Sequence, residues 1–155
     1  MRYWLFKSEP EVFSIDDLKN RPDSTTQWDG VRNYQARNFL RGEIKIGDQV
    51  LFYHSSSVNI GVAGVAEVVK GGYPDHTAWD PKSTYYDPTS TPDNPRWYMV
   101  DIKWKQSFKR LVPLQEIKQT PALQNMKLVQ KGMRLSVQPV TREEFEKIRE
   151  MGMKG

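Results

Sequence analysis

The sequence predicts an α+β domain, a small mixed β barrel of about six short strands with short helices between them. Candidate strands outnumber candidate helices, and no strand is regularly followed by a long crossover helix, which disfavours a parallel α/β sheet. Gly61 and Gly64 interrupt the longest strand candidate, and such glycines mark bends that help a small sheet to curl. The chain of 155 residues has the length of one domain, which we expect to span residues 1–155.

In the first half of the chain, short strands are expected to alternate with short helices. An aromatic-rich run is typical of a buried strand, and Ser14 followed by Asp17 is a helix-start pattern. Asp29 is the expected N-cap of the next helix, and Gly42 is its expected stop. The elements predicted here are a strand at residues 2–6, a helix at 14–20, a loop at 21–24, a helix at 31–41 and a strand at 49–54.

The second half is dominated by two long strand candidates, at residues 59–70 and 96–105. Alternation in the second strand predicts a mostly apolar core face made of Tyr98, Val100, Ile102 and Trp104. Residues 108–112 can return as its hairpin partner. Thr141 and Glu144 form a capping box for a terminal helix, with Phe145 and Ile148 facing inward. Between these elements we expect a helix at 113–119, a turn at 121–126 and a strand at 132–140.

Residues 71–95 form a long stretch without predicted helix or strand, and they contain five prolines and two glycines. A stretch of this length inside a compact domain is usually functional or disordered. Its aromatic rings argue against disorder, because disordered segments are poor in aromatic residues. We therefore expect an ordered binding loop or lid that offers the rings of Trp79, Tyr85 and Tyr86.

Composition excludes several kinds of chemistry. The chain has no cysteine, so it forms no disulfide, thiol nucleophile or thiolate metal site. His54 and His76 are the only imidazoles, and neither has a partner at metal-site spacing, so we expect no metal and no cofactor. No apolar run reaches the length of a membrane helix, and no leader precedes the first strand, so we expect a soluble intracellular protein.

Positive charge is concentrated towards the C-terminus. The net charge is +4, but residues 101–155 hold twelve Lys and Arg against six Asp and Glu, which makes +6. Residues 51–100 are acidic, with three basic residues against five acidic ones. A basic third of this kind suits a polyanion such as nucleic acid.

Residues 28–37 combine a tryptophan, an Asp-Gly turn, an amide and two guanidinium groups. A nucleobase needs a flat apolar slot, partners for its edge and cations for the attached phosphates, and this stretch supplies all three. An amphipathic helix with a solvated arginine face and a core tryptophan would also explain the stretch. Of the other tryptophans, Trp4 and Trp104 are expected in the core.

Six short motifs, in this order along the chain, resemble the EVE domain family, and specifically its thymocyte nuclear protein-like branch. The motifs are Tyr3-Trp4-Leu5-x-Lys7-Ser8-Glu9-Pro10, Trp28-x-Gly30-Val31-Arg32-Asn33-Tyr34-x-Ala36-Arg37, Phe52-Tyr53-His54-Ser55, Tyr85-Tyr86-Asp87-Pro88, Pro95-Arg96-Trp97-x-x-Val100 and Arg134-Leu135-Ser136-Val137-Gln138-Pro139-Val140. Each motif is modest alone, whereas the ordered set is specific and covers nearly the whole chain.

The resemblance implies a PUA-like pseudo-barrel, related to the YTH domains that recognise methylated adenine in RNA. It also implies a non-enzymatic pocket for a modified base, with modified cytosine in DNA as the leading ligand and modified RNA as the other. Carried over by motif, the base pocket would consist of Ser8, Trp28, Val31, Asn33, Tyr53, His54, Ser55, Trp97 and Ser136. The phosphate-binding residues would be Arg32, Arg37 and Arg134. The short ends favour a minimal bacterial-type form, which we expect to be a cytoplasmic monomer.

Two other functions stay open at this point. Lys7 and Glu9 project to the same side of an extended segment, so an amidohydrolase similar to ASCH domains could use them on an acylated nucleoside. A solvated ion pair at a strand end would explain the same two residues. The aromatic stretch at 71–95 could instead make the domain a protein-interaction module.

Overall fold

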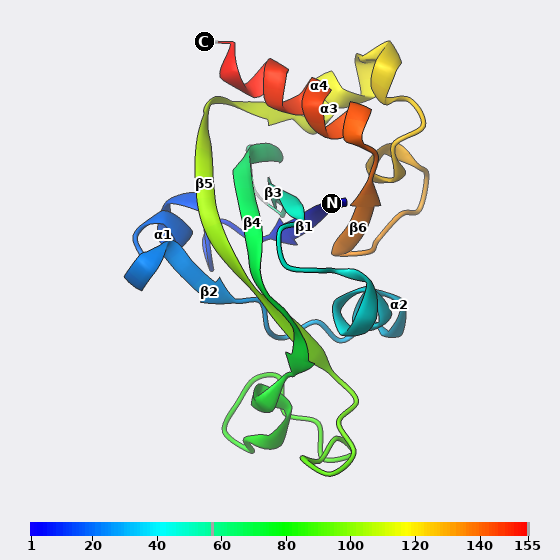
Figure 1. Cartoon of the computed structure of the whole chain (residues 1–155). Coiled ribbons are helices and arrows are strands. Elements are labelled where there is room, and N and C mark those ends of the chain that lie inside the picture. The colour runs from blue at the N-terminus through cyan, green and yellow to red at the C-terminus, as the bar shows by residue number, and fades with distance from the viewer. Residues whose placement is uncertain (57, 155) are drawn as a thin grey trace.

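One mixed sheet of six strands organises the chain (Figure 1). The structure, a computed structural model, describes residues 1–56 and 58–154. Neighbouring strands follow the order β2-β5-β4-β3-β1-β6, and β1 and β3 are parallel while all other neighbours are antiparallel. The strands are β1 (Tyr3–Ser8), β2 (Thr25–Gln27), β3 (Gln49–His54), β4 (Gly61–Pro74), β5 (Tyr98–Pro113) and β6 (Val137–Val140). The α+β prediction is confirmed, but within the described residues the sheet curls without closing, because β2 and β6 remain its edges.

The sheet bends through irregular pairing between the two longest strands, β4 and β5. Their register shifts at four places, one of them between Val62 and Gly64. A Cβ atom on Gly61 or Gly64 would lie 2.2 or 2.3 Å from a carbonyl oxygen of β5, so only glycine permits this approach. The bends predicted at these glycines are therefore confirmed. The prediction that residues 108–112 return as a hairpin partner of residues 96–105 is wrong. Both segments belong to the single strand β5, which bulges allow to bend.

Alternate side chains of the strands enter two hydrophobic clusters on opposite faces of the sheet. Trp4 and Phe6 of β1 belong to the first cluster, whereas Leu5 belongs to the second. Trp4 is fully buried as predicted, and its Nε1 donates a hydrogen bond to the carboxylate of Asp48 at 3.0 Å. Trp104 only borders the first cluster, so the prediction that it is a core residue holds in part.

Short helices cover both faces. They are α1 (Ile15–Lys19), α2 (Tyr34–Asn38), α3 (Leu114–Gln119) and α4 (Arg142–Met153), with 3₁₀ turns at Pro22–Ser24, His76–Trp79, Pro121–Leu123 and Lys127–Val129. The helix start predicted at Ser14 and the capping box predicted at Thr141 are confirmed, and Ser14 also forms a capping box. Phe145 and Ile148 are buried as predicted. None of the helices within the described residues has the length and apolar character needed to cross a membrane.

The helix predicted at residues 31–41 begins later than expected. Asn33, and not Asp29, is its N-cap, and the Asn33 side chain accepts a hydrogen bond from the Ala36 N–H at 3.0 Å. The backbone turns at Gly30 with φ +79°, so the helix cannot start at Asp29. The helix then ends in a π turn, Phe39–Glu43, which contains Gly42 instead of stopping before it.

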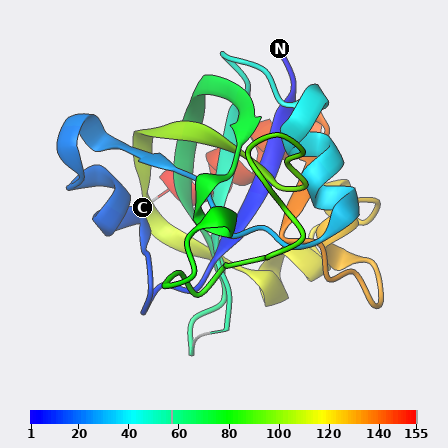
Figure 2. The same ribbon diagram turned by 90° about the horizontal axis from the view of Figure 1, so that it is seen from below.

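The segment 75–97 caps the far end of the β4–β5 pair (Figure 1), and in Figure 2 it lies in front of the sheet. Its backbone is tied to itself and to its base, for example by Asp87 N–H donating to the Ala78 carbonyl at 2.9 Å. Asp75, Ala78 and Ser90 are buried within it. An ordered loop is therefore present here, shorter than predicted because β4 extends to Pro74.

Candidate functional site

A cleft of about 560 Å³ opens at the C-terminal end of β1. Its walls come from β1, the loop that follows β1, strand β2 and the extended segment before α2, with single residues from the loop after α1, from the 75–97 segment and from the loop before β6. The lining residues are Lys7, Ser8, Glu9, Val12, Phe13, Arg21, Thr26, Gln27, Trp28, Asp29, Gly30, Val31, Arg32, Tyr85 and Ser136.

Trp28 joins the cleft to the hydrophobic core. Its ring packs against Phe6 at 5.4 Å and against Phe52 at 5.6 Å between centroids, with Phe13 edge-on at 6.4 Å. Only 9% of Trp28 is exposed. Trp28 is therefore a core tryptophan that presents a small part of its surface to the cleft.

Gly30 allows Tyr85 of the 75–97 segment to pack closely against the segment before α2. Its N–H donates to the buried carboxylate of Asp75 at 2.8 Å, and its positive φ is one that other residues rarely adopt. A Cβ atom at this position would lie 2.5 Å from the ring of Tyr85. The absence of a side chain at Gly30 thus lets the Tyr85 ring lie against the backbone and line the cleft.

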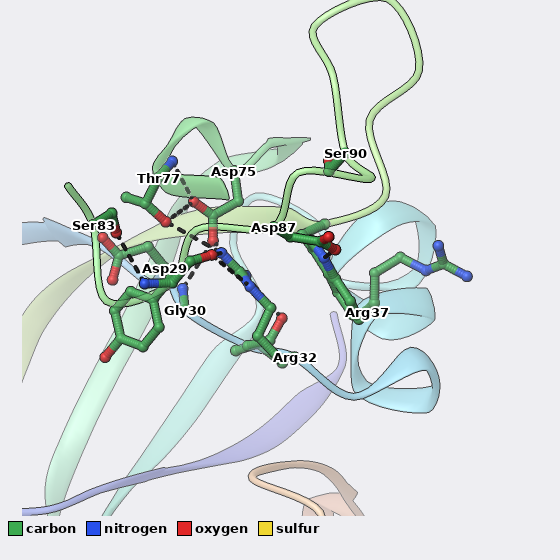
Figure 3. Close-up of polar contacts among 12 residues, drawn as sticks. Asp29, Gly30, Arg32, Arg37, Asp75, Thr77, Ser83, Asp87 and Ser90 are labelled. Carbon is green, nitrogen blue, oxygen red and sulfur yellow. Dashed lines mark hydrogen bonds and ion pairs between the residues drawn. The ribbon is translucent and has the colours of Figure 1, made fainter. Parts of the chain in front are cut away.

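Arg32 is the centre of a polar cluster that holds this wall, which we call the Asp75 cluster: Gly30, Arg32, Asp75, Thr77 and the Tyr85 carbonyl (Figure 3). Arg32 forms an ion pair with Asp75 at 3.0 Å and donates to the Tyr85 carbonyl at 2.8 Å. Burial raises the pKa of Asp75, but hydrogen bonds from Thr77, Gly30 and Arg32 outweigh it and hold this pKa below its usual range. The guanidinium is consequently engaged inside the protein and positions Tyr85.

Four of the nine residues predicted for the base pocket line the cleft: Ser8, Trp28, Val31 and Ser136. Arg32 and Tyr85, predicted for phosphate binding and for the lid, line it too. The predicted residues that lie elsewhere are Asn33, Tyr53, His54, Ser55 and Trp97 from the pocket, Arg37 and Arg134 from the phosphate set, and Trp79 and Tyr86 from the lid.

Structural roles account for several residues outside the cleft. Tyr53 points to the other face of the sheet, into the second hydrophobic cluster, where burial raises its pKa to about 12. Ser55 continues the β1–β3 pairing, with its N–H donating to the Ser8 carbonyl at 2.8 Å. Trp97 stacks on Tyr34 at 4.9 Å and donates to Asp87 at 2.6 Å.

The remaining predicted residues are also spread apart. The Arg37 guanidinium lies 4.9 Å from the Tyr34 ring and donates to the Arg96 carbonyl at 2.9 Å. Trp79 is half-buried, and its Nε1 has no hydrogen-bond partner among the described residues. Tyr86 is exposed beside Tyr85 but does not line the cleft.

His54 holds the start of α1 instead of lining the cleft. Its Nε2 accepts a hydrogen bond from the Ile15 N–H at 3.1 Å, so the neutral ring carries its proton on Nδ1. Burial lowers the pKa of His54 below its ordinary 6.5, although Asp16 and Asp17 act in the opposite direction. The folded protein therefore favours neutral His54.

We expect the free energy of unfolding to decrease as pH falls below about 6.5, because the unfolded chain then binds a proton that folded His54 excludes until a lower pH. Chemical denaturation between about pH 7 and 5 measures this slope. His54→Gln has no titrating ring and should lose this part of the pH dependence. The exposed His76→Gln is the matched control and should keep it, and equal slopes in both variants would contradict the role of His54.

Several lining residues carried no clear signal in the sequence. Thr26 and Gln27 belong to β2, a three-residue strand too short to show alternation. Phe13 belongs to the turn after β1, which the Ser8 hydroxyl closes by donating to the Phe13 carbonyl at 2.5 Å. Lys7 and Glu9, the candidate hydrolase residues, also line the cleft. Burial lowers the pKa of Lys7, but no ion pair joins Lys7 to Glu9 in the described part of the chain.

The cleft can accept a planar ring. Phe13, Trp28 and Tyr85 supply aromatic surface, and hydroxyl, amide and carboxylate groups supply hydrogen bonds. Among the described residues, no three His, Asp or Glu side chains gather as a metal site would need. The arrangement is thus suited to binding a flat polar molecule.

A curved mixed sheet with short helices and an aromatic-lined cleft at the end of β1 is the architecture expected of a PUA-like domain. The chain belongs to the EVE domain family, whose pattern it matches over residues 2–151. It is 47% identical to human thymocyte nuclear protein 1 over 161 residues, which cover 93% of this chain and 71% of that protein.

Solved structures agree with this assignment. Human THYN1 in complex with 5-methylcytosine-containing DNA matches with a TM-score of 0.92 and 45% identity, covering 100% of this chain and 99% of that chain. The YTH domain of Zygosaccharomyces rouxii MRB1, solved with N6-methyladenosine RNA, matches with a TM-score of 0.55 and 15% identity, covering 99% and 85%. At that identity the second match shows the shared fold alone.

Proposed function

We propose that this domain reads modified nucleic acid by holding one flipped, modified base in the cleft, without performing chemistry on it. The cleft carries the proposal: its volume of about 560 Å³ suits a small-molecule site, and aromatic and hydrogen-bonding side chains share its walls. The complex of human THYN1 with 5-methylcytosine-containing DNA supports modified cytosine in DNA as the first ligand to test. Modified RNA is the second.

The polar groups of the cleft suit a cytosine edge. The exocyclic amino group of cytosine is a donor, and the Asp29 carboxylate and the hydroxyl oxygens of Ser8 and Ser136 are acceptors in the cleft. Base flipping costs a few kcal/mol, which stacking and edge hydrogen bonds must offset. Tyr85, 40% exposed, offers more free ring surface for stacking than the nearly buried Trp28.

A binding screen tests the proposal directly. Oligonucleotides of one sequence, carrying cytosine, 5-methylcytosine or other modified bases in DNA or RNA, are titrated with the protein. We expect one modified form to bind more tightly than its unmodified counterpart. Equal affinity for every form would contradict modified-base reading.

Tyr85→Ala should weaken binding of the preferred oligonucleotide by about tenfold to a hundredfold, because stacking on one ring contributes about 1–3 kcal/mol. Tyr86→Ala is the matched control, since Tyr86 is equally exposed but lies outside the cleft. The isotherms of both variants are compared with that of the unmutated protein. If Tyr86→Ala weakened binding as much as Tyr85→Ala, the prediction that the base stacks on the Tyr85 ring would be contradicted.

The screen also separates a reader from a hydrolase, because Lys7, Ser8 and Glu9 all line the cleft. Each oligonucleotide and an acylated cytidine are incubated with the protein, and the products are analysed. We expect no turnover. Release of more product than protein present, abolished by Lys7→Met, would instead establish an enzyme.

A further inference from the structure

A second groove, of about 360 Å³, runs between α2 and the loop before β6. It is lined by Asn33, Gln35, Phe39, Lys127, Lys131, Gly132, Met133, Arg134 and Leu135. Three of these side chains are cations and none is acidic. The base cleft differs, since Glu9 and Asp29 accompany its own cations.

The three cations are available to a ligand. Lys127, Lys131 and Arg134 are exposed, and none of them takes part in the ion pairs found among residues 1–56 and 58–154. By contrast, the guanidinium groups of Arg32 and Arg37 donate hydrogen bonds to other groups of the protein. Of the three arginines predicted to bind phosphate, Arg134 is thus the one positioned for an external anion.

The loop that carries these cations is held in place. Gly132 turns the backbone with φ +77°, and the Met133 N–H donates to the Gln130 carbonyl at 3.1 Å. The fully buried Gln138 donates through Nε2 to the Leu135 carbonyl at 2.8 Å. The backbone that carries Lys131 and Arg134 is therefore hydrogen-bonded on both sides of these two residues.

Residues that are adjacent in the sequence line the groove and the base cleft. On one wall, Arg32 lines the cleft and Asn33 lines the groove; on the other, Ser136 lines the cleft and Leu135 lines the groove. Arg134 lies two residues from Ser136, a separation of at most about 7 Å along the chain. A strand whose base enters the cleft therefore has the groove beside it.

We propose that this groove binds the sugar–phosphate backbone of the nucleotides next to the base in the cleft. The inference rests on the proposed function. Lysine contacts phosphate as a point charge and arginine as a bidentate donor, and both contacts are independent of sequence. The groove would supply affinity and register, while the cleft would supply the choice of base.

The test is a triple variant, Lys127→Gln, Lys131→Gln and Arg134→Gln, titrated with single-stranded DNA that carries the preferred base or its unmodified counterpart. We expect the slope of log K against log salt to decrease in magnitude by about 2, since each phosphate contact contributes about 0.7. Affinity at low salt should fall for both oligonucleotides by the same factor. The ratio of their affinities should stay unchanged.

The matched control removes two lysines and one arginine elsewhere, by Lys109→Gln, Lys118→Gln and Arg142→Gln. These residues are exposed on β5, α3 and α4 and line neither the cleft nor the groove. The control should retain the slope of the unmutated protein. An unchanged slope in the groove variant, or an equal change in the control, would overturn the proposal. Lack of preference for any modified base would contradict the proposed function, while a reduced slope would still support the groove.

Discussion

Replacing Trp28 by alanine is expected to lower the free energy of unfolding by about 3–5 kcal/mol, as for other large aromatic residues removed from a core. The ring packs against Phe6, Phe13 and Phe52, so its loss leaves a cavity in the first hydrophobic cluster. For a chain of this length the melting temperature should fall by roughly 6–20 °C.

Thermal melting and a binding isotherm of the same Trp28→Ala preparation measure the effect. Trp28→Phe keeps a ring among the three phenylalanines and should lose clearly less stability than Trp28→Ala. A near-normal melt of Trp28→Ala together with lost binding would show that the ring serves the ligand and not the core.

Arg32→Met is the second change expected to have a large effect, because it leaves the fully buried carboxylate of Asp75 without its ion-pair partner (Figure 3). Breaking a buried pair from one side costs about 3–5 kcal/mol, and the partial exposure of Arg32 places this case towards the lower end. Adding Asp75→Asn to Arg32→Met should restore part of the loss, since no charge then remains buried alone. Chemical denaturation of the single and double variants measures the loss of stability and its partial recovery.

Arg110→Met is the matched control for this experiment. Arg110 forms a pair with Glu116 at 2.7 Å, but both side chains are more than a third exposed, and such surface pairs contribute about 0–1 kcal/mol. A loss in Arg110→Met as large as that in Arg32→Met would contradict the importance of burial.

The same Arg32→Met variant also tests whether Arg32 binds phosphate. Arg32 positions Tyr85 by donating a hydrogen bond to the Tyr85 carbonyl. We therefore expect the folded variant to bind the preferred base more weakly, while the salt dependence of binding stays unchanged. A smaller salt slope would instead return Arg32 to the phosphate-binding set.

Patterns confined to a few neighbouring residues predicted the fold well. The capping boxes at Ser14 and Thr141, the buried strand around Trp4 and the glycine bends of β4 all depend on local geometry. The predicted start of α2 was wrong, because Asp29 and Asn33 are both good caps, and the turn at Gly30 that separates Asp29 from the helix is hydrogen-bonded to Asp75. That residue is 45 positions away from Gly30, whose N–H it binds.

The site was predicted only in part for a similar reason. Ser8, Trp28, Val31 and Ser136 line the cleft, whereas the ring of Tyr53, the pairing partner of Lys7 on β3, belongs to the second hydrophobic cluster. Which side a strand residue faces follows from register, and register between distant strands is not visible in either strand alone.

The parallel pairing of β1 with β3 has a consequence for the order of folding. Parallel neighbours require a crossover, here residues 9–48, and all the residues that line the cleft except Tyr85 and Ser136 lie in β1 or in this crossover. Pairing β1 with β3 closes a long loop before any contact offsets its entropy, so such steps are slow. The cleft therefore depends on this pairing, and a chain in which only β4 and β5 have paired lacks the walls of the cleft.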